Sequence, residues 1–142
     1  MDPQFVISDE AALRQLYPAT HDLALKKFQQ ELGLHAQAFI RRSPFLCLGT
    51  QDLSGRADVS PRGDPPGFVR VLDSNTLAIP DRPGNNRLDS LSNIIENPAV
   101  GLLFMIPGFD DTLRVNGMAN IVTDPGLLAT MEVNNRLPLW QS

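Results

Sequence analysis

The chain has 142 residues, and 42 % of them are apolar, which is typical of one globular domain and excludes a disordered chain. Its net charge of −4 excludes a general nucleic-acid binder, because such proteins need a basic face. Its apolar runs are shorter than the roughly 20 residues of a membrane-spanning helix, and its first residues do not have the pattern of a signal peptide. With Cys47 as its one cysteine, it is expected to work in the cytoplasm, without binding nucleic acid or membrane.

The first third of the chain predicts helices that cover a sheet. A first helix is expected over residues 8–17, with Ser8 as its N-cap. A second is expected over residues 20–32, with Gly33 as its C-cap. A third is expected over residues 35–42, where Ser43 and Pro44 end it.

From Phe45 onward the hydrophobic pattern is typical of strands. Strands are expected over residues 45–50, 56–60, 68–72 and 76–79, with turns at residues 51–55 and 73–75. Residues 61–67 contain three prolines and two glycines and are expected to be irregular. Residues 81–86 are expected to form a loop.

The remaining residues predict one helix, two long strands and a closing helix. The helix is expected over residues 87–96, ended by Asn97 and Pro98, and the closing helix over residues 125–133. Residues 99–106 are apolar throughout and predict a central buried strand. A strand over residues 112–122 is expected to bulge or bend at Gly117.

Short turns between consecutive strands predict an antiparallel sheet curled into a barrel, within a mainly β fold with helices (α+β). We expect a single domain over residues 1–142. It would comprise a helical preface (1–43), a barrel with one inserted helix (44–124), and a C-terminal helix with a tail (125–142).

No catalytic cluster is visible in the sequence. His21 and His35 have no cysteine or carboxylate at metal-ligand spacing, so no metal site is expected. Cys47 lies in an apolar strand and is expected to be a small buried hydrophobe rather than a nucleophile. Ser54 and Ser60 have no triad context. Such a chain is expected to take its chemistry from a cofactor.

The stretch from residue 60 to residue 87 is rich in arginine, glycine, proline and asparagine, which favours an anion cradle for the phosphate of a nucleotide-like cofactor. The alternative is a pair of proline-rich hairpin loops with solvated arginines. Arg87 would open a helix, whose free N–H groups favour an anion. Asn86 would either cap that helix or bond a ligand, and Arg114 would either face solvent or point into the site.

Several motifs in order resemble the pyridoxamine 5′-phosphate oxidase-like flavoprotein family, over about residues 40 to 125. They are FLCLGTQDLSGRADVSPRGD, PDRPGNNR within a longer matching segment, and TLRVNGMANI. The resemblance implies a split β-barrel that forms a homodimer, with FMN at the dimer interface and a small-molecule substrate that it does not identify.

The resemblance also implies site residues. Arg62 on its strand, with the loop residues Asn85, Asn86 and Arg87, would hold the flavin phosphate. The strand end at Pro80, Asp81 and Arg82 would pass along the flavin ring. Two positions on a later strand would contact the flavin: Thr112, where the family has a glutamine, and Arg114.

The chain departs from the authentic oxidases at two places. Their phosphate-binding SRK triplet is replaced by PGNNR, and the sequence ends soon after Val133, as expected of a natively short chain or of a fragment. We therefore expect an FMN-dependent oxidoreductase with hydride transfer at the flavin and no assigned catalytic residues. The alternatives are a non-catalytic carrier or sensor of a flavin or haem, and a structural dimer whose site has decayed.

Overall fold

The computed structural model describes residues 1–16, 30–81, 88–131 and 140–141. The chain divides into two compact units, Met1–Gln30 and Glu31–Ser142. The first contains a 3₁₀ helix, η1 (Pro3–Phe5), and helix α1 (Glu10–Leu16). Asp9, rather than the predicted Ser8, caps α1, since its Oδ1 accepts the backbone N–H of Ala12 at 2.7 Å.

The second unit opens with α3 (Leu34–Arg42), which confirms the third predicted helix. Most of the second predicted helix lies outside the described residues, and its described end, at residues 30–32, is not helical. Gly33 is the N-cap residue of α3 instead of the C-cap of a preceding helix. The helix ends as predicted at Ser43, whose hydroxyl donates to the carbonyl oxygen of Phe39 at 3.1 Å.

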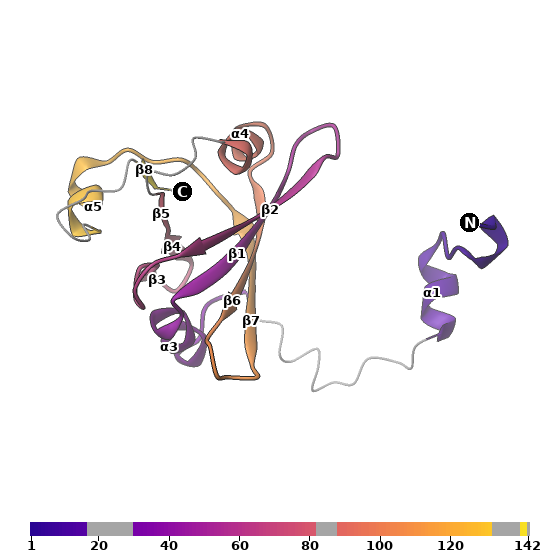
Figure 1. The fold of residues 1–142 in the computed structure, drawn as a ribbon, viewed down its shortest axis with the longest axis horizontal. Helices are drawn as coiled ribbons and strands as arrows, with labels where there is room; N and C mark the ends of the chain where they lie inside the picture. The colour runs from indigo at the N-terminus through magenta and orange to yellow at the C-terminus, as the bar shows by residue number, and fades with distance from the viewer. Residues whose placement is uncertain (17–29, 82–87, 132–139, 142) are drawn as a thin grey trace. The chain divides into compact units, whose positions relative to one another are not determined.

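Four antiparallel strands form the main sheet in the order β2-β1-β6-β7 (Figure 1). Two short ladders accompany it, β3 with β4 and β5 with β8, and α4 packs against β1 and β2. The predicted α+β class with antiparallel sheet is confirmed. The elements are β1 (Phe45–Gln51), β2 (Ala57–Gly63), β3 (Arg70–Asp73), β4 (Thr76–Ala78), β5 (Pro80–Asp81), α4 (Asp89–Glu96), β6 (Ala99–Met105), β7 (Thr112–Met118), α5 (Pro125–Thr130) and β8 (Trp140–Gln141).

Besides shifts of one or two residues at strand ends, three strand predictions were wrong. β2 continues through Pro61 to Gly63, where an irregular segment was expected, because β2 is an edge strand and an edge accommodates a residue without an N–H. Asp81 was expected to begin a loop, but it belongs to β5. This strand forms by pairing with β8, a contact between distant parts of the chain. β7 ends at Met118 and keeps a regular register through Gly117, so the predicted bulge is absent from this ladder.

The helix boundaries also differ from the predictions. α4 begins at Asp89 with Leu88 as its N-cap residue, two residues later than expected. α5 begins as predicted at Pro125, where the Asp124 side chain accepts the N–H of Gly126 at 2.9 Å. It ends at Thr130 with Met131 as its C-cap residue, so the prediction of a helix through residue 131 was wrong, and residues 132–133 lie outside the described residues.

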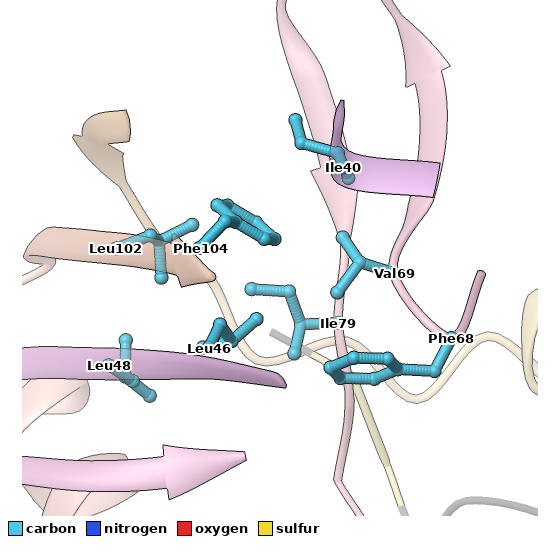
Figure 2. Packing of buried hydrophobic residues seen from close by; sticks show 8 residues of the cluster. All are labelled: Ile40, Leu46, Leu48, Phe68, Val69, Ile79, Leu102 and Phe104. Atoms are coloured by element: carbon cyan, nitrogen blue, oxygen red, sulfur yellow. The ribbon is translucent and has the colours of Figure 1, made fainter. Parts of the chain in front are cut away.

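The core lies on one face of the main sheet. Figure 2 shows the side chains of Leu46 and Phe104 turned toward Val69 and Ile79. β6 was expected to be buried throughout, but only Leu102 and Phe104 of this strand are buried, and its other residues are partly or fully exposed. The side chains of β6 on the opposite, outer face are therefore apolar but only partly covered by the chain's described residues. The buried cluster comprises Ile40, Leu46, Leu48, Phe68, Val69, Ile79, Leu102 and Phe104.

Candidate anion-binding site

Three polar side chains of β2 lie on the core-facing side of the sheet. Asp58, Ser60 and Arg62 are half-buried, while the residues between them are exposed. The register pairs Arg62 with the buried Leu46 on β1, so the arginine shares the face of the core. An edge strand can carry such side chains because water and a neighbouring helix both reach its inner face.

Arg62 is bonded on two sides. Its Nη1 donates to Oδ1 of Asp81 on β5, and its Nε donates to Oγ of Ser60 at 3.3 Å. The two side chains of the ion pair are 21 % and 13 % exposed, so each charge depends on the other for compensation. A guanidinium has five N–H donors, and these two contacts use two of them.

Helix α4 closes the site through Ser90, which is only 4 % exposed. The hydroxyl oxygens of Ser90 and Ser60 are 3.0 Å apart, and Ser90 donates to Oδ2 of Asp58 at 3.0 Å. α4 presents Ser90 because its apolar residues Leu91 and Ile94 pack the same side of the helix inward. A second bond between this helix and the sheet runs from Nδ2 of Asn93 to Oγ1 of Thr50 on β1, at 3.0 Å.

Sequence reasoning missed Asp58, Ser60 and Ser90 as members of this site. A signal for the first two exists, because Asp-x-Ser-x-Arg places three polar side chains on one face of a strand. For Ser90 the signal is its place beside the apolar residues of an amphipathic helix. Neither signal identifies which polar residues meet.

The structure brings only part of the predicted site together. Asp81 contacts Arg62, and Pro80 lies buried beside Asp81 on β5. Thr112 and Arg114 are exposed on β7, and the register places them on the outer face of the sheet, opposite Arg62. The other predicted residues lie outside the described part of the chain: Arg82, Asn85, Asn86 and Arg87.

The residues weighed for other chemistry lie elsewhere. Cys47 is half-buried on the outer face rather than buried, and His35 is exposed on α3. Among the described residues, no group of three His, Cys, Asp or Glu side chains is placed to hold a metal ion. No described helix is both long enough and apolar enough to span a membrane.

Comparison with known proteins identifies the family. Residues 33–140 match the sequence model of the family described as pyridoxamine 5′-phosphate oxidase. The chain belongs to the pyridoxamine 5′-phosphate oxidase family. Because the match covers β1 to β7 and both bonded sides of Arg62, the candidate site lies wholly inside the family's domain. No curated protein sequence matches the chain significantly.

Solved structures of two proteins share the fold. The crystal structure of HupZ from Group A Streptococcus has a TM-score of 0.59 at 16 % identity, covering 78 % of this chain and 85 % of that one. A candidate pyridoxamine 5′-phosphate oxidase from Lactobacillus delbrueckii has a TM-score of 0.61 at 18 % identity, covering 80 % and 87 %. Together with the antiparallel sheets, these likenesses confirm the predicted split-barrel fold.

Proposed function

We propose that two copies of this chain bind FMN between them and act as an oxidoreductase in the cytoplasm on a small-molecule substrate. The observation that carries the proposal is the position of Arg62. Its guanidinium lies half-buried at the edge of the sheet, held by Asp81 and Ser60 on two sides. Family membership makes FMN the first cofactor to test.

The described groups around Arg62 suit one part of a phosphate site. Arginine forks match phosphate oxygens in pairs, and the guanidinium has donors beyond those used by Asp81 and Ser60. The charges of Arg62, Asp81 and Asp58 sum to −1, which is unfavourable for an anion. We therefore propose that Arg82 and Arg87, with Asn85 and Asn86, supply the remaining charge and hydrogen bonds.

The outer face of the sheet supports a two-chain site. Val59 and Met118 on this face are 68 % and 71 % exposed, although both are apolar. Thr112 and Arg114 lie on this face and cannot reach Arg62 through the sheet of their own chain. A second copy would cover the apolar face, and Thr112 and Arg114 of one copy would complete the site of the other.

FMN, when bound, supplies hydride chemistry at its N5 atom. The chain's residues would bind and orient it: Arg62 would hold the phosphate, and the backbone of Pro80, Asp81 and Arg82 would contact the ring. Such a reaction needs no general acid from the protein. This agrees with the sequence, in which no catalytic cluster is visible.

The proposal is tested by titrating the purified protein with FMN and with riboflavin, which lacks the phosphate. Arg62→Ala should weaken FMN binding by about ten- to a hundredfold, the effect of losing a charge-assisted hydrogen bond, and leave riboflavin binding unchanged. Arg56→Ala is the matched control, since Arg56 is exposed in the β1–β2 turn. Equal FMN binding by both variants would overturn the proposal. Reduction of the bound FMN by NADH would favour an oxidoreductase, and its absence would favour a carrier.

A further inference from the structure

The inner face of β2 carries a row of hydrogen bonds whose direction is fixed at both ends. An arginine Nε can only donate, and the carboxylate of Asp58 accepts from Ser90. Ser90 thus uses its one proton on Asp58 and must accept from Ser60. Ser60 in turn accepts from Nε of Arg62. The bonds therefore run from Arg62 through Ser60 and Ser90 to Asp58, over 3.3, 3.0 and 3.0 Å, and we call this series of three bonds the relay.

This chain of bonds locks each hydroxyl in one orientation. Ser90 is almost fully buried, so its hydroxyl has no ready exchange with water if it rotates away. Hydrogen bonds arranged in series also polarise one another, so that each strengthens the next. On its other side, Arg62 is held by Asp81. The guanidinium plane is therefore fixed from α4 and from β5 at once.

We propose that Ser60, Ser90 and Asp58 are positioning residues for Arg62, which turn the remaining N–H groups of its guanidinium toward the phosphate of the cofactor. The inference rests on the proposed function, because the phosphate is that of the proposed FMN. Ser90 lies in the first turn of α4, which begins at Asp89. The relay thus bonds the start of this helix to the strand of Arg62.

The alternative is that these bonds only hold α4 on the sheet. The affinity ratio of FMN to riboflavin separates the two roles, because a loss of packing weakens both ligands alike. Ser90→Ala should lower this ratio about fivefold, as expected for one net hydrogen bond, and Arg62→Ala should lower it further. In an Arg62→Ala background, Ser90→Ala should not change the ratio.

Matched variants come from the same elements. Asn93→Ala removes the other bond of α4 to the sheet without touching the relay, so it should lower stability and leave the ratio unchanged. Ser60→Ala should lower the ratio, and Ser60→Thr, which keeps the hydroxyl, should restore it. A Ser90→Ala ratio equal to that of wild type, with Arg62→Ala still impaired, would overturn the positioning role and leave the proposed function intact.

A readout without cofactor separates the two failures. In the protein without flavin, the Nε–H proton of Arg62 should exchange with water more slowly in wild type and Asn93→Ala than in Ser60→Ala or Ser90→Ala, as NMR can measure. If wild type binds FMN and riboflavin with equal affinity, the phosphate site is refuted, and the relay then positions no phosphate-binding group. Equal exchange rates in all four proteins would refute the relay itself.

Discussion

Leu102 and Leu103 are neighbours on β6 that face opposite sides of the sheet. Leu102 is 7 % exposed in the core, and Leu103 is partly exposed on the outer face. If a second copy covers the outer face, truncating the two leucines should have different consequences. Leu102→Ala should destabilise the folded chain, whereas Leu103→Ala should chiefly weaken the association of two chains.

The magnitudes follow from burial. Leu102→Ala should lower the free energy of unfolding by about 2–5 kcal/mol, because it removes buried carbons and leaves a cavity. Leu→Ala removes three carbons, about 2.4 kcal/mol of transfer free energy at full burial. Because Leu103 is already partly buried, dimerisation can bury at most about a third of its side chain, so Leu103→Ala costs up to about 0.8 kcal/mol per copy. A symmetric dimer would lose up to about 1.6 kcal/mol, and its dissociation constant would rise up to about fifteenfold.

Sedimentation velocity over a range of concentrations measures the dissociation constant, and urea unfolding measures stability. Leu103→Ala should shift the monomer–dimer midpoint to higher concentration, and Leu102→Ala should lower the unfolding midpoint even at concentrations where the chain is dimeric. A wild-type chain that stays monomeric at all concentrations would refute the reasoning. An unchanged dimer midpoint in Leu103→Ala would show that the interface lies elsewhere.

Other expectations follow from single contacts. Asp81→Asn should lower the free energy of unfolding by roughly 1–2 kcal/mol in thermal melts, because it leaves a half-buried guanidinium uncompensated; no loss would mean that the ion pair is unimportant. Gly55→Ala should cost about 1 kcal/mol or more, since Gly55 has a φ of 92°, whereas Gly117→Ala should be nearly neutral because open space surrounds it. Hydrogen bonds from the Ser54 hydroxyl and from the backbone hold the pKa of Asp52 below its usual value. These bonds stabilise the turn at pH values above the pKa that Asp52 has in the unfolded chain, and this stabilisation is lost as the pH falls through the lower pKa of the folded state. Ser54→Ala should therefore raise the pKa of Asp52, which an NMR titration measures.

The sequence pattern predicted a helix or strand correctly where the residues of that segment alone determine its structure. Helix α3 and strand β1 appear nearly where periodicity predicts them, because their apolar positions match one face and Ser43-Pro44 separates them. Pro61 misled the prediction, since the tolerance for proline depends on β2 being an edge strand. That position is a property of the assembled sheet, which no single segment encodes.

The candidate site depended on contacts that the sequence does not express. Arg62 and Asp81 are 19 residues apart, and Ser60 and Ser90 are 30 apart, so neither pair has a local signature. Alternation places Arg62 on one face of its strand, but only the register across β1, β6 and β7 shows that Arg114 lies on the other. The family was identified from ordered motifs, and the roles of those motif residues and the single-domain organisation stay predictions.

The central claim is that two chains bind FMN between them. The most direct measurement is sedimentation velocity of the protein purified with excess FMN and then freed of unbound flavin, recorded in the flavin absorption band. We expect one flavin per chain, sedimenting with a species of twice the chain mass. A dimer without flavin absorbance, or flavin that sediments with a single chain, would contradict a site shared by two chains.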